Sequence, residues 1–132
     1  MTSELGITNK VKFLGHMSRE LVLKEMQNCS FFVLTSNYET FGIVIIEALS
    51  CGKPVVSTKC VGPEEIINDT NGLLVEKENV KSLSKGLVYM YKNINNYNSK
   101  QIRENCVNLY GEKSFILQIN KAYKKVLQRR NI

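Results

Sequence analysis

The stretch FFVLTSNYETFGIVIIEALSCGKPVVST, residues 31–58, decides the fold class. It begins with the apolar run 31–35, which is typical of a parallel strand covered on both faces. A polar loop follows, and then a strongly apolar helix is predicted over 41–50, with Gly52 as the usual residue just beyond a helix end. Residues 54–58 predict the next buried strand. This order of strand, helix and strand indicates a parallel α/β unit.

The same alternation continues on both sides of this stretch. We expect further strands over 11–15 and 73–75, and further helices over 19–26, 62–67, 80–93 and from about 98 to the end, interrupted near Tyr110 and Gly111. Ser18 is a suitable N-cap for the helix that follows it. The pattern predicts an α/β fold with a Rossmann-like, doubly wound parallel sheet and helices on both faces. Ligands bind such sheets beyond the carboxyl ends of the strands, in the loops after Leu14, Leu34 and Ser57.

Length and composition describe one ordinary globular domain. The chain has 132 residues, of which 43% are hydrophobic and 23% charged, so it can bury one core without a disulfide or a metal. No apolar run approaches the length of a membrane-spanning helix, and the N-terminus lacks a signal-peptide pattern. We therefore expect a cytoplasmic protein.

The scarcity of some residue types excludes several kinds of site. His16 is the single histidine and Asp69 the single aspartate, so neither an Asp-x-Asp metal site nor a His-rich zinc site can form. The four cysteines are too far apart for a Cys-x-x-Cys pair and are expected to act as small buried hydrophobes: Cys29, Cys51, Cys60 and Cys106. We therefore predict no metal site.

The formal charge of +6 is unevenly distributed, with a net −1 in residues 1–66 and +7 in residues 67–132. A basic C-terminal half is compatible with a nucleic acid, an anionic membrane surface or an acidic partner. A solvated, lysine-rich helical surface explains it equally well. Tyrosines interleave with lysines in this half, but no nucleic-acid-binding motif accompanies them, and we expect no nucleic-acid partner.

Two carboxylates, Glu39 and Glu47, frame the most informative loop. Glu47 lies within an almost wholly apolar helix, where a lone carboxylate is unfavourable unless it is hydrogen-bonded or reaches solvent. Carboxylate oxygens accept hydrogen bonds from sugar hydroxyls, and free N–H groups near Thr40, Phe41 and Gly42 would bind an anion at the helix N-terminus. Both carboxylates could then line one pocket for a phosphorylated sugar. Alternatively, Glu39 only favours the helix start and Glu47 points to solvent.

The context of these carboxylates resembles the donor-site signature of retaining GT-B glycosyltransferases, group 1 or family four. The resemblance covers about residues 4–92 and is carried by VKFLGH at 11–16, CSFFVLTS at 29–36, ETFGIVIIEALSCGKPVV at 39–56, VGPEEII at 61–67 and NGLLV at 71–75. The family transfers a hexosyl group from a nucleoside-diphosphate sugar to a glycan or lipid-linked acceptor, with retention and without a bound metal or a cofactor.

The resemblance also implies a role for each matched residue. Glu47 would hold the ribose hydroxyls, and Glu39 would contact a hydroxyl of the donor sugar. The N–H groups of Phe41, Gly42 and Ile43 would face the sugar and the phosphates, with Thr40 beside them. Gly15 and His16 would lie near the base, but His16 is not expected to be a catalytic base, and no catalytic residue is assigned.

Residues 1–132 resemble only the C-terminal, donor-binding domain of the family, with a core over about 10–92 and C-terminal helices over about 93–132. The N-terminal acceptor domain has no counterpart here, nor do the Arg and Lys that neutralise the leaving diphosphate. We therefore expect the chain to be inactive alone. Its basic final helix, Lys121 to Arg130, would pack on the missing domain or touch the inner membrane surface. The alternative is a truncated, non-enzymatic nucleotide-binding or interaction module.

Overall fold

A computed structural model describes the backbone of residues 1–130 and the side chains up to residue 128. Its centre is a parallel three-stranded sheet in the order β1-β2-β3, formed by β1 (Phe32–Leu34), β2 (Val55–Thr58) and β3 (Gly72–Val75). In the register, Val56 of β2 lies opposite Val33 of β1 and Leu73 of β3. The sheet confirms the parallel α/β class that the alternation of apolar segments predicts.

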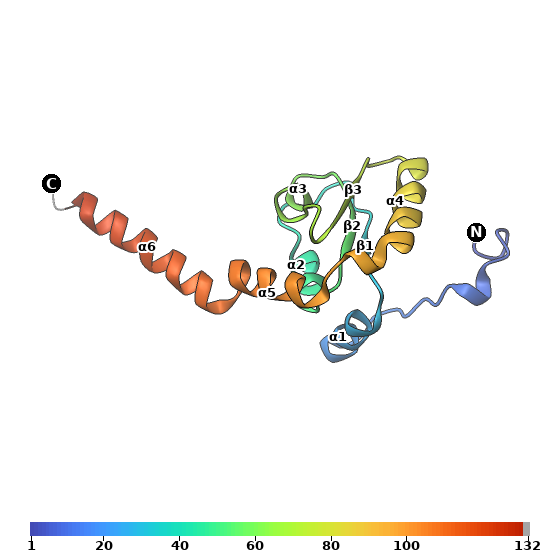
Figure 1. Cartoon of the computed structure of the whole chain (residues 1–132), viewed down its shortest axis with the longest axis horizontal. Helices are drawn as coiled ribbons and strands as arrows, with labels where there is room; N and C mark the ends of the chain where they lie inside the picture. The colour runs from blue at the N-terminus through green and yellow to red at the C-terminus, as the bar shows by residue number, and fades with distance from the viewer. Residues whose placement is uncertain (131–132) are drawn as a thin grey trace.

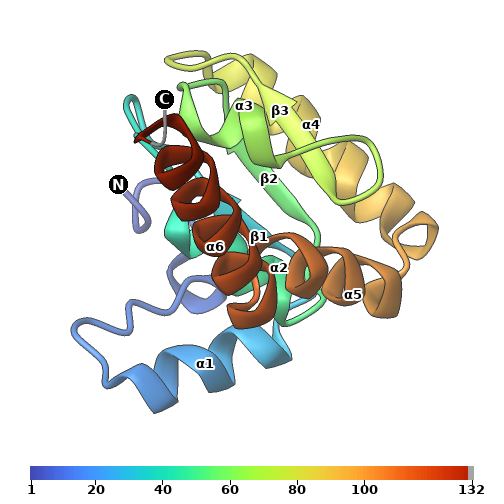
Figure 2. The ribbon, with the colours of Figure 1, turned by 90° about the vertical axis from the view of Figure 1, so that its left-hand side faces the viewer.

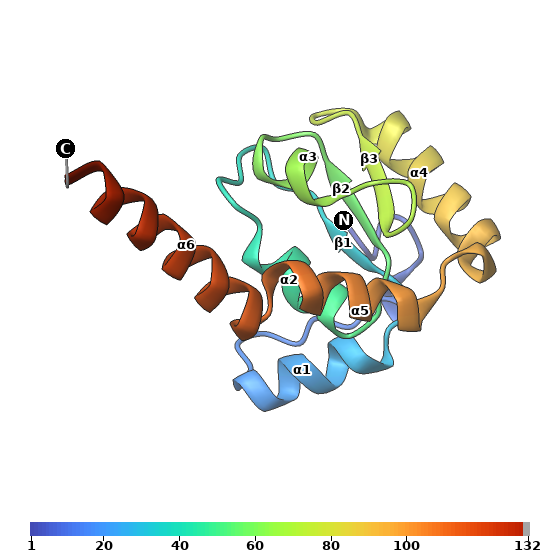
Figure 3. The same ribbon diagram turned by 60° about the vertical axis from the view of Figure 1, so that its left-hand side comes forward.

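Helices cover both faces of this sheet (Figures 1 and 2). The described helices are α1 (Arg19–Asn28), α2 (Ile43–Ser50), α3 (Gly62–Ile66), α4 (Val80–Asn93), α5 (Ser99–Tyr110) and α6 (Glu112–Arg130), with short 3-10 turns at Thr8–Lys10 and Ile94–Asn96. The α4 layer packs on one face, and α2, α3 and α5 pack on the other (Figure 3). These bounds confirm the helices predicted for 80–93 and for the two segments separated near Gly111.

Alternation along β2 explains why it holds the two layers together. Val55 and Val56 are both fully buried, but successive side chains of a strand point to opposite faces. Val55 belongs to a cluster with Ile45 and Leu49 of α2, whereas Val56 belongs to a cluster with Met90 of α4. The predicted buried strand at 54–58 is therefore correct, and it forms the middle of the sheet.

The strand predicted for 11–15 is wrong. Residues 11–15 form no strand, and Phe13 is 81% exposed. A strand requires a neighbour with which its N–H and C=O groups can pair. Among the described residues β1 pairs with β2 alone, so its other edge is unpaired and residues 11–15 lie away from it as extended coil. The apolar residues of this segment remain exposed for the same reason.

Three further expectations need adjustment. The run 31–35 is half-buried in β1 and not covered on both faces, because β1 is an edge strand. The helix predicted over 41–50 begins only at Ile43. Ser18 does cap α1, accepting a hydrogen bond from the Leu21 N–H at 3.4 Å. Of the four cysteines, Cys60 and Cys106 are buried as predicted, whereas Cys29 and Cys51 are only half-buried.

The C-terminal helix α6 extends away from the sheet (Figure 1). It follows directly on α5, and it exposes large apolar side chains along its length, among them Phe115 at 62% and Tyr123 at 65%. The side chains of Arg129 and Arg130, part of the predicted basic tail, lie outside the described residues. The long C-terminal helix is therefore confirmed, whereas its partner surface stays a prediction.

Candidate functional site

The loop between β1 and α2 is shaped by its own carboxylate. One oxygen of Glu39 accepts hydrogen bonds from the N–H of Gly42 at 3.1 Å and of Phe41 at 3.4 Å. Gly42 has a φ of 88°, a backbone conformation that favours glycine, and its turn delays the helix to Ile43. Two of the N–H groups predicted to bind an anion therefore have an acceptor within the chain. Among the described residues, the N-cap Gly42 has no side chain that could accept a hydrogen bond from the first turn of α2.

A second loop, which follows β2, fixes this first one in place. Glu39 and Val61 form an isolated parallel β-bridge, and the Gly62 N–H donates to the Glu39 carbonyl at 2.8 Å. A Cβ added at Gly62 would lie 2.8 Å from the Glu39 carbonyl oxygen and 2.8 Å from the Phe41 nitrogen. Only glycine therefore allows these two backbones to approach so closely. The two loops form one unit at the carboxyl edge of the sheet.

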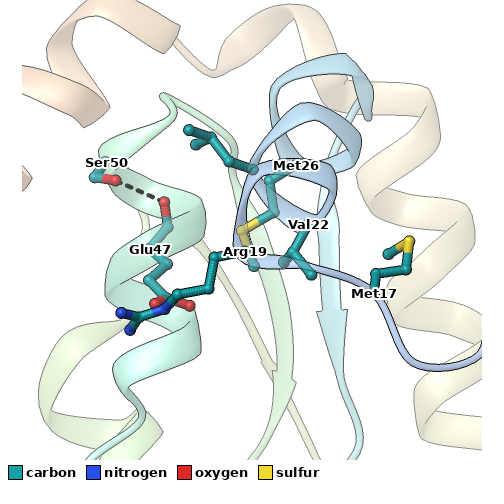
Figure 4. Close-up of a pocket in the computed structure, with 7 residues that line it drawn as sticks. Met17, Arg19, Val22, Met26, Glu47 and Ser50 are labelled. Carbon is teal, nitrogen blue, oxygen red and sulfur yellow. Dashed lines mark hydrogen bonds between the residues drawn. The ribbon is translucent and has the colours of Figure 1, made fainter.

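Glu47 lies on a different side of α2 from the buried residues of that helix, and it lines a cavity between α1 and α2. Its volume is about 340 Å³ (Figure 4). Residues of α1, of α2 and of the segment before α1 line it: Met17, Arg19, Val22, Leu23, Met26, Glu47 and Ser50. The cavity thus combines an apolar wall with a guanidinium and a carboxylate. That combination suits a ligand with an apolar ring face, hydroxyl groups and negative charge.

Glu47 also borders a second cavity on the other side of α2, with a volume of about 500 Å³. It lies where α6 leaves α5 and is mostly apolar, with the lining residues Phe41, Ile43, Ile46, Glu47, Ser50, Leu109, Tyr110, Phe115 and Gln118. Burial raises the pKa of the Tyr110 phenol in this wall above its ordinary value. Neither cavity is lined by Glu39.

Glu47 is itself an exposed residue, and Thr40, Gly15 and His16 lie at the surface as well. Thr40 is exposed beside Glu39, and Gly15 and His16 are exposed in the coil before α1. Their neighbour Met17 reaches the cavity that Glu47 lines. The structure thus brings Met17 and Glu47 to one cavity, which Gly15 and His16 do not line, and it keeps Glu39 at the separate junction with Val61. The roles assigned to these residues stay predictions.

Sequence reasoning missed Arg19 and Met17 as lining residues. One signal was present: Ser18 caps α1, so the residue directly after it must sit at the first helical position, beside the loop that precedes the helix. Among the described residues no group of three or more His, Cys, Asp or Glu side chains is placed to hold a metal ion. Within residues 1–130, no helix combines the length and apolar character needed to cross a bilayer.

The family model of the glycosyl transferases, group 1, matches residues 1–106. An uncharacterized glycosyltransferase of Methanocaldococcus jannaschii is 39% identical over 84 residues, which are 63% of this chain and 24% of that protein. The chain thus spans about a quarter of the length of this curated relative.

Solved glycosyltransferase structures share the fold. A sucrose-phosphate synthase from Thermosynechococcus elongatus matches with a TM-score of 0.83 and 25% identity, over 97% of this chain and 33% of that one. HepE of Anabaena in complex with UDP matches with a TM-score of 0.76 and 27% identity, over 97% and 35% of the two chains. HepE has also been solved with UDP-glucose.

Proposed function

The chain belongs to the glycosyl transferases of group 1, and on this basis we propose that it binds the nucleotide-sugar donor of a glycosyl transfer reaction. The donor is a nucleoside-diphosphate hexose. HepE of Anabaena, whose fold this chain shares, holds UDP and UDP-glucose in its solved complexes, which supports a donor of this class.

The observation that carries the proposal is the cavity that Glu47 shares with Met17 and Arg19. The Glu47 carboxylate accepts hydrogen bonds from the two ribose hydroxyls, since each of its oxygens has free lone pairs there. Met17 and the segment before it, Gly15 and His16, provide the surface against which the base lies. The Arg19 guanidinium lines the same cavity, and it attracts the negatively charged diphosphate.

The donor sugar and the phosphates lie toward the β1–α2 loop. Glu39 contacts a sugar hydroxyl, and the N–H groups of Phe41, Gly42 and Ile43, with Thr40 beside them, face the phosphates. The Glu39 carboxylate accepts hydrogen bonds from two of these N–H groups, those of Phe41 and Gly42. Donor binding therefore exchanges one acceptor for another at the same N–H groups, and it frees the carboxylate for the sugar.

The reaction of the whole enzyme transfers the hexose to a glycan or lipid-linked acceptor with retention of configuration, in polysaccharide biosynthesis and without a bound metal or cofactor. The acceptor would be held by a second domain. The 132 residues alone are expected to bind the donor without transferring its sugar, because no residue here matches the Arg and Lys that stabilise the leaving diphosphate in the family.

The exposed helix α6 supports a cytoplasmic protein that meets a membrane from its inner side. Phe115, Ile119 and Tyr123 recur along one side of the helix at spacings of three to four residues, and they are all exposed. Lys121, Lys124 and Lys125 lie on the other side by the same periodicity. This pattern suits the surface of an anionic bilayer.

Calorimetric titration of UDP, GDP and ADP into the chain tests donor binding. The matched variants are Glu47→Ala and Glu104→Ala, since Glu104 is an exposed glutamate on α5 outside both cavities that Glu47 borders. Losing hydrogen bonds to a charged group costs about 1.5–3 kcal/mol, so Glu47→Ala should weaken binding by about ten- to a hundredfold. Glu104→Ala should bind like the parent. Absence of nucleotide binding, or equal binding by both variants, would contradict the assignment.

A second candidate is a non-enzymatic interaction module. The unpaired edge of β1 and the exposed Phe13 favour it, because both are surfaces that another chain could cover. This function predicts self-association without nucleotide binding. Sedimentation velocity would separate the two, since a monomer that binds nucleotide supports the donor-binding domain alone.

A further inference from the structure

Val61 has a backbone conformation that a β-branched residue rarely adopts. Its φ is 68° and its ψ is −87°, close to the rare and strained form of the γ-turn. Such conformations cost about 1–3 kcal/mol and persist where their surroundings hold them. Here the Glu64 carboxylate accepts the Val61 N–H at 3.2 Å, and the following Gly62 N–H is bound to the Glu39 carbonyl.

Neither the turn nor the core accounts for a valine at this place. Glycine adopts a positive φ without strain, so the turn alone would favour glycine. The valine side chain is 56% exposed, so burial gives it little stabilisation in return. Since neither the turn nor burial favours valine, we infer that its apolar side chain has a role at the surface.

Val61 lies beside Glu39. The two residues pair in a parallel β-bridge, so their backbones run side by side. Gly62 packs against the backbone of Glu39 and Phe41, so the distance between the two loops is fixed. The exposed Val61 isopropyl group therefore extends from a backbone that is held directly beside that of Glu39.

We propose that Val61 determines donor specificity by forming an apolar wall of the sugar subsite. The inference rests on the proposed function and deepens it. Glu39 accepts a hydrogen bond from a sugar hydroxyl, while Val61 contacts the C–H face of the same pyranose ring. A carboxylate beside an apolar surface suits a hexose, which presents hydroxyls at its rim and C–H groups on its face. The base and the ribose, held by Glu47 in its own cavity, do not reach Val61.

Two variants distinguish the effect of the Val61 side chain on sugar binding from its effect on the backbone of the turn. Val61→Gly removes the side chain and relieves the backbone strain, whereas Val61→Ile keeps both. Val80→Gly is the control, because Val80 is an apolar residue that is 83% exposed on α4 and far along the chain from Glu39. For each variant we would measure the melting temperature and the affinities for UDP and UDP-glucose, with GDP and GDP-mannose replacing them if the chain prefers guanine.

We expect Val61→Gly to raise the melting temperature, to bind UDP within twofold of the parent and to lose at least fivefold in affinity for UDP-glucose. Val61→Ile should keep the parent ratio of the two affinities, and Val80→Gly should not change it. An unchanged ratio in Val61→Gly overturns the proposal, and so does an equal loss for UDP and UDP-glucose, which would indicate a purely structural residue. A parent chain that binds neither nucleotide overturns the proposed function instead, and Val61's role with it.

Discussion

Helices α4 and α6 look alike in sequence but have different surroundings in the structure. Both repeat apolar residues every three to four positions. In α4, Gly86 and Met90 are buried against the sheet. In α6, Phe115 and Tyr123 are exposed at 62% and 65%. Periodicity thus predicts that a segment is an amphipathic helix, but not which surface covers its apolar side.

The difference has a local cause. Gly86 allows α4 to approach β2 and β3 closely, since a Cβ there would lie 2.5 Å from a methyl carbon of Val75 and 3.7 Å from one of Val56. Nothing comparable lies beside α6 among the described residues, because α5 carries it away from the sheet (Figure 1). The α4 face therefore stabilises the fold, and the α6 face is free to bind something else.

The largest difference between the two helices is expected when one side chain in each of them is shortened. Met90→Ala removes a fully buried side chain from the cluster with Val56 and should lower the free energy of unfolding by about 2–5 kcal/mol. Val126→Ala shortens a side chain on α6 that is 55% exposed, and it should change the free energy of unfolding by less than about 0.5 kcal/mol. Urea denaturation followed by circular dichroism measures both. Similar losses in the two variants would mean that α6 is covered after all.

A smaller loss is expected where α4 touches the sheet. Alanine normally stabilises a helix relative to glycine by about 0.5–1 kcal/mol. At Gly86 the added methyl meets Val75, so Gly86→Ala should destabilise the chain by about 1–3 kcal/mol. Ser114→Ala on α6 is the matched substitution and should be neutral or stabilising. Thermal melts of the two variants should move in opposite directions. A gain in melting temperature for Gly86→Ala would show that the contact is looser than described.

The exposed face of α6 should matter for binding and not for stability. Phe115→Ser with Tyr123→Ser removes two exposed apolar side chains, and should weaken binding to vesicles of anionic phospholipid by about tenfold or more. The melting temperature should remain that of the parent. Vesicle co-sedimentation measures the binding, with vesicles of neutral phospholipid as the control. If the parent chain does not bind the anionic vesicles, the membrane contact is wrong.

The smallest effect concerns pH. Tyr97 packs against both core clusters, and burial raises the pKa of its phenol above 10.0. The folded chain therefore holds this proton more tightly than the unfolded chain, and the related stability is present below about pH 10 and lost as the pH rises through the raised pKa. Tyr97→Phe should show less loss of stability from pH 9 to 11 than the parent. Denaturation at several pH values tests this.

The sequence was sufficient to predict helices and strands where the local apolar pattern agrees with the packing in the structure. Val55 to Thr58 and Val80 to Asn93 could be predicted because their apolar residues meet neighbours that the same chain supplies. It was insufficient for residues 11–15, which have a strand pattern but pair with no strand among the described residues. A strand forms only beside another strand with which it can hydrogen-bond. The apolar pattern of one segment does not show whether such a neighbour is present.

The candidate site shows the same limit. Glu39 and Glu47 could be selected from sequence, because a carboxylate in an apolar helix and another before its N-terminus are conspicuous. The sequence could not predict that these two carboxylates lie at separate places in the structure. The turn at Gly42 folds the Glu39 carboxylate back on its own loop, while Glu47 faces α1. Val61 was not selected at all, since only the backbone angles distinguish it from any other exposed valine.

The most direct test of the donor-binding account pairs a change in the protein with a change in the ligand. UDP and its 2′,3′-dideoxy analogue would be titrated into the parent chain and into Glu47→Ala. If Glu47 holds the ribose hydroxyls, their removal weakens binding to the parent by about tenfold or more but to the variant by no more than about twofold, because the two changes delete the same interaction. Equal weakening in both proteins would contradict the account, since Glu47 would then not contact the ribose.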